Sequence, residues 1–266
     1  MSIQIEPVPS RCTYVLGVRV DILSQRQALD VIEQIVAKRR AGLAGGEVLA
    51  CQQVVTLNTE FVMEARRNSA FREVINSAAL VVADGIGIVW ATHLGKAREA
   101  RVPERITGTD TLMALAKRCA RSGYRLYLLG AAPGVAEQAA ARLQAIAPGL
   151  EIAGTYAGSP APGEEEGILE RLRNANADVL CVAYGAPAQE LWIKRNLARL
   201  PVAIAMGVGG AFDFLSGRQR RAPRLMQRLG LEWLYRLYRE PWRWRRMLAI
   251  PRFMMIVLIK RNGKPS

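Results

Sequence analysis

The chain alternates short apolar runs with longer segments in which apolar residues recur at helical spacing. The clearest run covers residues 79–83, between polar flanks, and predicts a buried strand of a parallel sheet. Further strands are predicted at residues 13–22, 48–57, 124–129, 150–156, 178–184 and 202–206. Helices are predicted between them, at residues 25–40 with Ser24 as cap, 60–78 in two pieces, after Asp84 as far as Gly95, 111–121, 135–147 and 164–174. This alternation favours an α/β fold, with a Rossmann-like, mostly parallel sheet flanked by helices.

An acid follows the clearest apolar run. Asp84 precedes Gly85 and Gly87, and a helical segment starts directly afterwards. At the carboxyl edge of an open parallel sheet, such an acid projects into the crevice where ligands bind, and glycines let a ligand approach the backbone. An aspartate that only caps the next helix gives the same pattern, so the residues alone leave both interpretations open.

Two polar side chains lie near the end of the strand predicted at residues 48–57. Thr56 and Asn58 are two residues apart and therefore share one face of an extended segment, where they can offer a hydroxyl and an amide to a ligand. Thr and Asn also form turns locally, and from the residues alone turn formation is the favoured interpretation. Thr59 is the expected cap of the next helix.

The loop at residues 101–110 combines charge, proline and glycine between two helices. Arg105 is a candidate ligand for phosphate or carboxylate because its guanidinium offers a bidentate fork. The alternative is a salt bridge to Glu104 or Asp110. Thr109 or Asp110 is the expected cap of the following helix.

Two later strand ends are rich in glycine. Backbone amides at residues 185–190 and 207–210 can cradle a phosphate or a base. Neither segment has the GxGxxG pattern of a dinucleotide-binding site, and residues 211–213, which follow the second segment, are not expected to begin a helix. The glycine pair Gly85 and Gly87 does not complete that pattern either, because Trp90 stands where the third glycine is required. The chain also has no GxxxxGK[ST] sequence and no DxD pair of the kind that commonly holds a metal-bound diphosphate.

Cysteine spacing and hydropathy narrow the class of protein. The four cysteines are far apart, without a CxxC pair, and His93 is the single histidine, so we expect buried free thiols and no zinc site or disulfide framework. A lone histidine of this kind is expected on the surface or in packing. No apolar run reaches the length of a membrane-spanning helix, and residues 1–11 lack the apolar core of a signal peptide. The expectation is a cytoplasmic protein without a cofactor.

Positive charge is concentrated at one end of the chain. Residues 218–266 hold 14 Lys or Arg and two acids, Glu232 and Glu240. This segment carries nearly all of the chain's net charge of +14. We therefore divide the chain into an α/β catalytic domain at residues 1–217 and a basic helical appendage at residues 218–266. Such asymmetry indicates nucleic acid, an anionic membrane or phosphorylated ligands.

The appendage mixes arginine with large apolar side chains. Residues 224–238 have helical period, Trp242 and Trp244 alternate with arginine, and residues 253–259 are all apolar. Aliphatic and aromatic side chains among arginines favour a helix lying in a membrane interface. The alternatives are an amphipathic helix docked on the same chain and a surface for single-stranded nucleic acid, which does not require large aliphatics.

Seven short motifs, each weak alone, occur in one order along residues 13–252. They are Thr56-x-Asn58, Ala83-Asp84-Gly85, Arg105-Ile106-x-Gly108-x-Asp110, Gly185-x-Pro187-x-Gln189-Glu190, Gly207-Val208-Gly209-Gly210-x-Phe212-Asp213, Arg221-Ala222-Pro223 and residues 230–237 with Glu240-Pro241. Together they resemble the motifs of the WecG/TagA/CpsF family of bacterial glycosyltransferases (glycosyltransferase family 26).

The resemblance implies an inverting, metal-independent transfer of a sugar from a UDP-sugar to a sugar carried on polyprenyl diphosphate. The sugar is N-acetylmannosamine, its uronic acid or glucose, and family members build wall teichoic acid linkage units, enterobacterial common antigen and exopolysaccharide. The enzyme is then a hexosyl- or N-acetylhexosaminyltransferase attached peripherally to the inner face of the cell membrane. The oligomeric state stays open, a homo-oligomer included.

The resemblance also implies roles for individual residues. Asp84 matches the proposed general base, which takes the proton from the acceptor hydroxyl. Basic residues of the tail match groups that stabilise the departing diphosphate without a metal, although the aromatic segment at residues 242–244 departs from other members. The implied catalytic group is Asp84, Thr56, Asn58, Arg105 and Gln189, and the implied substrate-binding group is Gly185, Pro187, Gly209, Gly210, Asp213, Arg236, Arg243 and Arg246.

Two other function classes compete with this one. A non-enzymatic nucleotide- or nucleic-acid-binding protein also accounts for the basic tail, and failure to transfer sugar to a lipid-linked acceptor would favour it. A nicotinamide-dependent dehydrogenase is disfavoured by the broken glycine fingerprint.

Overall fold

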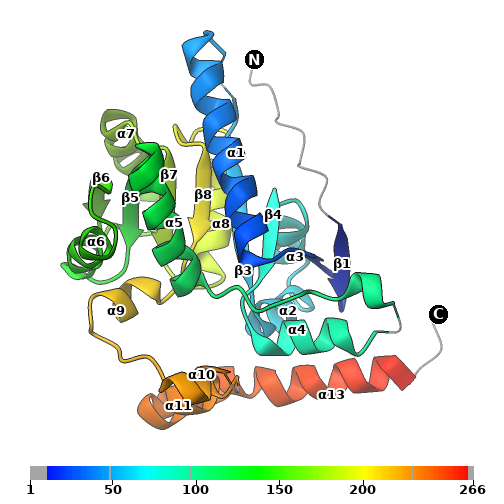
Figure 1. Cartoon of the computed structure of the whole chain (residues 1–266). Helices are drawn as coiled ribbons and strands as arrows, with labels where there is room; N and C mark the ends of the chain where they lie inside the picture. The colour runs from blue at the N-terminus through cyan, green and yellow to red at the C-terminus, as the bar shows by residue number, and fades with distance from the viewer. Residues whose placement is uncertain (1–10, 48, 96, 229, 263–266) are drawn as a thin grey trace.

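The fold is built on a six-stranded, wholly parallel sheet. The computed structural model describes residues 11–47, 49–95, 97–228 and 230–262. The strand order is β4-β3-β8-β7-β5-β6 (Figure 1). The strands are β3 (Gln52–Leu57), β4 (Leu80–Ala83), β5 (Arg125–Gly130), β6 (Glu151–Tyr156), β7 (Val179–Ala183) and β8 (Ile204–Gly207). The predicted α/β class is confirmed.

The first strand predicted from the sequence is in fact a hairpin. β1 (Cys12–Val15) and β2 (Val18–Asp21) pair antiparallel across a turn at Leu16 and Gly17, both with positive φ. The Asp21 carboxylate accepts the N–H of Val81 in the edge strand β4 at 2.8 Å. β4 is therefore fully buried although it has one strand neighbour, which confirms the prediction of a buried strand at residues 79–83.

Helices cover both faces of the sheet because its side chains alternate in direction. Val54 and Val82 face a core shared with α1 (Gln25–Ala44), α5 (Gly108–Ser122), α6 (Val135–Ile146) and α9 (Ala211–Leu215). Val55 and Val81 face the opposite side, which is covered by α2 (Thr59–Ala65), α3 (Ser69–Asn76), α7 (Glu165–Ala175) and α8 (Ala188–Asn196). α4 (Ile86–His93) and two short 3₁₀ turns, η1 (Arg98–Ala100) and η2 (Pro162–Glu164), complete the body.

Three predicted helix starts were wrong. Asn58, not Thr59, caps α2, because its Oδ1 accepts the Phe61 N–H at 3.0 Å. Thr107, not Thr109 or Asp110, caps α5. A helix, α9, does begin at Ala211 after the glycine turn, although the sequence suggested none. For α2 and α5 a side-chain hydrogen bond in the turn sets the first residue of the helix, which hydrophobic periodicity does not report.

The tail folds back across the carboxyl ends of the strands. It comprises α10 (Arg224–Arg228), α11 (Glu232–Arg239), η3 (Pro241–Arg243), α12 (Trp244–Met247) and α13 (Ala249–Asn262). Figure 1 shows α10, α11 and α13 in a layer beneath the body, with α13 passing below α4. The helix expected at residues 224–238 is divided at Gly230, whose φ is +71°.

One face of α13 belongs to the core of the body. Phe253 is fully buried and Val257 nearly so, in the cluster that contains the inner faces of α2 and α4. The opposite face exposes Met255, Leu258 and Ile259. The docked amphipathic helix, one of the alternatives left open by the sequence, therefore describes one side of α13. No helix in the described residues is long and apolar enough to cross a bilayer.

Candidate active site

A cavity of about 790 Å³ separates the carboxyl ends of β3, β4 and β8 from the tail. Asn58, Asp84 and Val208, which follow these three strands, all line it. The sheet brings these residues together because parallel strands place their carboxyl ends at one edge. Residues of α11, α12 and α13 form the opposite wall, so the cavity is enclosed by both parts of the chain.

The Asp84 carboxylate points toward the start of α5. Its Oδ2 accepts the N–H of Gly108, the first residue of that helix, at 3.2 Å. A helix N-terminus stabilises a carboxylate. Asp84 does not cap α4, because the cap position is Gly85 and no side chain bonds there. Of the two interpretations that the sequence left open, the structure thus supports a carboxylate at a ligand cavity.

Asn58 lies at the surface of the cavity, and Thr56 lies beneath it. Asn58 lines the cavity while its Oδ1 caps α2. Thr56 is buried, and its hydroxyl donates to the Gly207 carbonyl at 3.1 Å. A Cβ placed on Gly108 would lie 3.7 Å from Thr56 Oγ1 and 3.6 Å from Asp84 Oδ2. Thr56 therefore joins β3 to β8 directly beneath the cavity floor.

Gln189 joins the two glycine-rich loops. Its Oε1 accepts the N–H of Gly185, after β7, and the N–H of Gly209, after β8, each at 3.1 Å. Its Nε2 donates to Glu190 Oε1 at 2.7 Å. Glu190 is fully buried, and burial raises the pKa of its carboxyl to about 8 although the bond from Gln189 lowers it. The pair fixes the loops from below without lining the cavity.

An ion-pair chain ties the tail to the body. Arg105 Nη1 lies 3.2 Å from Glu232 Oε2 on α11, and Glu232 Oε1 lies 3.4 Å from Arg221 Nε. Arg221 Nη1 in turn lies 2.5 Å from Asp110 Oδ1. The expected alternative for Arg105, a bridge to Glu104 or Asp110, is replaced by a bridge to the tail.

Within this ion-pair chain, Asp110 and Arg221 keep their charges. Burial acts to raise the pKa of the Asp110 carboxyl, but bonds from Arg221 and Thr107 outweigh burial and leave that pKa below its usual value. Burial acts to lower the pKa of Arg221, and Asp110 and Glu232 raise it further than burial lowers it. Arg221 therefore keeps its positive charge beside the cavity, and Arg105 lines the same cavity as its neighbour in the ion-pair chain.

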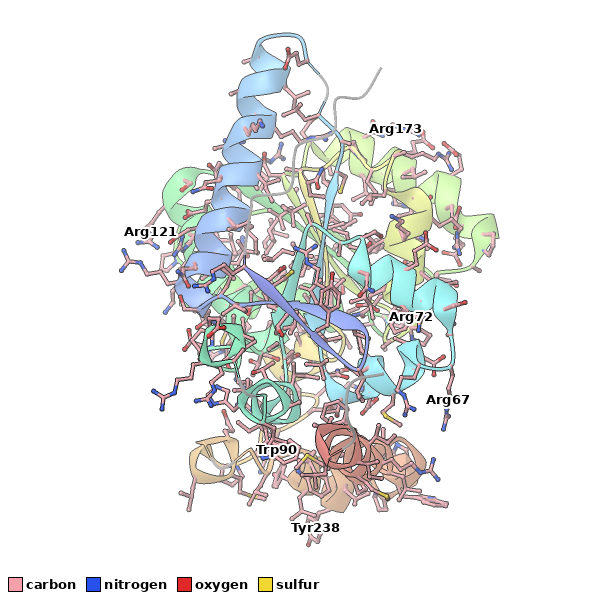
Figure 2. The ribbon with its side chains drawn as sticks, turned by 90° about the vertical axis from the view of Figure 1, so that its right-hand side faces the viewer. Arg67, Arg72, Trp90, Arg121, Arg173 and Tyr238 are labelled. Atoms are coloured by element: carbon pink, nitrogen blue, oxygen red, sulfur yellow. The ribbon has the colours of Figure 1, made fainter. Side chains whose placement is uncertain are left out.

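Much of the remaining cavity lining is apolar. Figure 2 shows Trp90 between α4 and the tail helices. A ligand that suits this space has a polar, charged part and a hydrophobic part. The apolar walls include Ile86, Trp90, Trp233, Trp244, Met247 and Pro251.

The residues proposed from the sequence separate into three groups. Asp84, Asn58, Arg105 and Gly210 line the cavity. Thr56, Gln189, Gly185, Pro187, Gly209 and Asp213 lie in or under the same strand-end loops but are not among the residues that line it. The backbone of Arg236 is on α11, of Arg243 on η3 and of Arg246 on α12, but their side chains lie outside what the structure describes.

Sequence reasoning missed several cavity residues. Arg221 and Glu232 lie in the family-like motifs, but no role was predicted for them. Trp90 was named only because it interrupts a glycine pattern. Their importance depends on the tail folding over the strand ends, which no local periodicity reports. The paired charges Arg105 and Glu232 are 127 residues apart in the chain.

The cysteines and the single histidine lie outside the cavity lining. The four cysteines are free; Cys51, Cys119 and Cys181 are buried, as expected, whereas Cys12 is exposed. His93 Nε2 lies 2.9 Å from the Val102 carbonyl, which is consistent with packing. Within residues 11–47, 49–95, 97–228 and 230–262, no group of three or more His, Cys, Asp or Glu is arranged to hold a metal ion.

Comparison with known proteins extends the resemblance to the whole described fold. The sequence profile of the glycosyl transferase WecG/TagA/CpsF family matches residues 13–266. A Bacillus spizizenii relative is 37% identical over 206 residues, which are 77% of this chain and 78% of the relative, and is named N-acetylglucosaminyldiphosphoundecaprenol N-acetyl-beta-D-mannosaminyltransferase. A Bacillus subtilis relative of the same name is 34% identical over 213 residues, 80% of this chain and 81% of the relative. The chain therefore belongs to the WecG/TagA/CpsF family of glycosyl transferases.

Proposed function

We propose that this enzyme transfers N-acetylmannosamine from a UDP-sugar to the N-acetylglucosamine of a polyprenyl diphosphate. The names of the two Bacillus relatives support this donor sugar and acceptor over the uronic acid and glucose that the resemblance also allows. The product belongs to the assembly of a cell-surface polymer. The observation that carries the proposal is the Asp84 carboxylate in a cavity lined by both charged and apolar side chains.

Asp84 acts as the general base. Its carboxylate removes the proton from the acceptor hydroxyl while that oxygen attacks the anomeric carbon of the donor sugar. The new C–O bond forms opposite the bond to UDP, so an α-linked donor yields a β-linked product. The Gly108 N–H holds Asp84 Oδ2 in place, so that the carboxylate is oriented before the acceptor arrives.

Arginine stabilises the leaving group. As the bond to UDP breaks, negative charge develops on the diphosphate, and fixed positive charge at that place lowers the barrier. Arg105 and Arg221 line the cavity in an ion-pair chain that fixes their positions. Arg236, Arg243 and Arg246 are proposed to add charge from the tail. We propose that these cations replace a metal ion.

The same tail attaches the enzyme to the inner face of the membrane. Of the twelve large hydrophobic side chains that are exposed in the described residues, nine lie after Arg218. They stand among the fourteen basic residues of that segment. Exposed aromatic and aliphatic groups beside arginine suit the interface of an anionic bilayer, where the polyprenyl acceptor resides.

Transfer assays test this function directly. A synthetic prenyl-diphospho-N-acetylglucosamine is mixed with a panel of UDP-sugars, and UDP release and the disaccharide product are measured. We expect turnover with UDP-N-acetylmannosamine, a β-linked product, and unchanged turnover in EDTA. Transfer of a different sugar corrects the donor, loss of turnover in EDTA that Mg²⁺ restores contradicts the arginine role, and absence of transfer with every donor contradicts the function.

A further inference from the structure

A second groove lies outside the active-site cavity, between the end of α2 and α13. Its volume is about 380 Å³. It brings Arg66 and Arg67, which follow the last turn of α2, beside Arg252 of α13. Its other walls are Met63, Met255 and Ile256, and no acid lines it.

The three guanidiniums of this groove have no carboxylate partner among the described side chains. Some arginines of the fold are paired with acids, as Arg118 is with Asp30 and Glu33, and others stand singly on the surface; this groove brings three unpaired ones to one place. Like charges gathered without a counter-charge repel one another. A groove that collects three of them is complementary to an anion, and guanidinium forks match the oxygens of a phosphate.

The remaining walls of the groove are hydrophobic. Met63 is nearly buried and Ile256 partly buried, so they form a floor, whereas Met255 is 57% exposed at the rim. Arg252 and Met255 share a face of α13 with Leu258 and Ile259, since residues three or four apart lie on the same side of a helix. The groove therefore opens on the same apolar face that α13 exposes.

We propose that this groove binds the phosphate of an anionic phospholipid. The arginines hold the phosphate oxygens, and Met63, Met255 and Ile256 contact the acyl chain next to the headgroup. This inference rests on the proposed attachment to the membrane and adds a defined lipid site to it. A phospholipid fits better than free phosphate because an apolar wall adjoins the cations.

The lipid site also fixes how the enzyme lies on the bilayer. Arg66 and Arg67 come from the α/β body, and Arg252 comes from the tail, so one lipid contacts both parts. α2 begins directly after Asn58, which lines the active-site cavity. Lipid bound at the far end of α2 therefore presents that cavity to the membrane surface in one orientation.

Vesicle binding by three variants tests the site. Arg66→Gln/Arg67→Gln removes two cations from the groove, and Arg121→Gln/Arg142→Gln removes two exposed cations from α5 and α6, on the opposite face of the sheet. Figure 2 shows Arg121 and Arg67 on opposite sides of the body. We expect the first variant to bind phosphatidylglycerol-containing vesicles about tenfold more weakly than wild type, and the second to bind them as wild type does.

The third variant, Arg66→Lys/Arg67→Lys, keeps the charge but removes the bidentate fork. A phosphate site loses affinity in it, whereas diffuse attraction to the surface does not, so wild-type binding by the lysine variant overturns the proposal. Equal losses in the two glutamine variants overturn it as well. Inorganic phosphate that displaces wild type from the vesicles at millimolar concentration indicates a free-anion site and overturns the choice of a lipid.

Transfer to a soluble short-chain acceptor separates this proposal from the proposed function. We expect all three variants to keep the wild-type rate, because the groove is distinct from the Asp84 cavity. A raised KM for that acceptor in the groove variants, with vesicle binding unchanged, assigns the groove to the acceptor and contradicts a phospholipid site. Wild type that transfers sugar but ignores anionic vesicles contradicts both the site and the membrane attachment, and leaves the transferase function standing.

Discussion

Asp84 and its bond to Gly108 are the smallest unit on which the proposed mechanism depends. In Asp84→Asn the amide oxygen can still accept the Gly108 N–H, so we expect the fold and UDP binding to remain. The amide cannot accept the acceptor's proton, and loss of a general base costs about 10²-fold or more in rate. The measurement is the single-turnover transfer rate together with the Kd for UDP.

Glu60 provides the matched comparison for Asp84. It is a second carboxylate on the cavity wall, in the first turn of α2. We expect Glu60→Gln to reduce transfer less than Asp84→Asn does. An Asp84→Asn rate within tenfold of wild type, with a severe loss in Glu60→Gln, would move the general base to Glu60.

Glu190 makes stability depend on pH. Burial raises its pKa from an ordinary 4.5 to about 8, so between these values the folded chain keeps a proton that the unfolded chain has lost. The free energy of unfolding from this group therefore falls as pH rises from about 5 to about 8, by up to about 1.4 kcal/mol per pH unit. Glu190→Gln removes that dependence while keeping an oxygen for Gln189.

Urea unfolding at pH 5 and pH 8 measures the effect. We expect the stability of Glu190→Gln relative to wild type to increase between the two pH values. The comparison with wild type cancels the other titrating groups. A difference between the two proteins that is constant with pH would mean that Glu190 is already ionised in the fold.

At the scale of elements, Gly230 sets the approach of the tail to α4. Its φ is +71°, and an added Cβ would lie 2.6 Å from Ile86 Cγ2. Gly230→Ala therefore combines backbone strain of about 1–2 kcal/mol with a collision against a cavity residue. We expect faster proteolysis between α10 and α11 and a lower transfer rate.

Gly217 offers the control for Gly230. Its φ is +79°, and nothing lies within 4 Å of an added Cβ, so Gly217→Ala carries the same strain without the collision. We expect this variant to lose less activity and to keep its resistance to protease. Equal effects in the two variants would show that backbone strain, and not contact with Ile86, controls the tail.

Most of the individual strands and helices could be predicted from the sequence, whereas the way the tail packs on them could not. Strands such as β7 and helices such as α6 were found because burial on two faces and apolar spacing are local patterns. Asp84 was found because the end of a parallel strand is also visible locally. The wall that the tail contributes was not, since Glu232 reaches Arg105 only when residues 127 positions apart meet. Helical period in the tail predicted helices but not the surface on which they pack.

At the scale of the whole molecule, the tail has two faces, and the proposed function gives them different tasks. Its inner face completes the cavity through Arg221, Glu232 and Trp233, and buries Phe253 against the body. Its outer face exposes Leu258 and Ile259, which do not line the cavity. We therefore expect that catalysis and the proposed membrane attachment can be disturbed separately.

We expect removal of the tail to disturb both. A chain ending at Ser216 retains every strand of the sheet, so we expect its circular dichroism to show a folded α/β domain. It loses the apolar groups that cover α2 and α4, and we expect lower stability, because a fully buried Phe contributes about 1.5–3 kcal/mol. It should fail to transfer sugar even to a soluble short-chain acceptor, since one wall of the cavity is gone.

The full-length variant Leu258→Ser/Ile259→Ser disturbs only the outer face. Both side chains are exposed, so the fold and the transfer rate to the soluble acceptor should match wild type, while binding to anionic vesicles weakens. Co-sedimentation with vesicles and the soluble transfer assay are measured on the same preparations. If the shortened chain transfers to the soluble acceptor at the full-length rate, the tail is only an anchor, and the roles of Arg221 and Arg236 in catalysis fail. If instead the serine variant loses soluble transfer as the shortened chain does, the outer face of α13 supports the active site as well, and the two tasks are not separable.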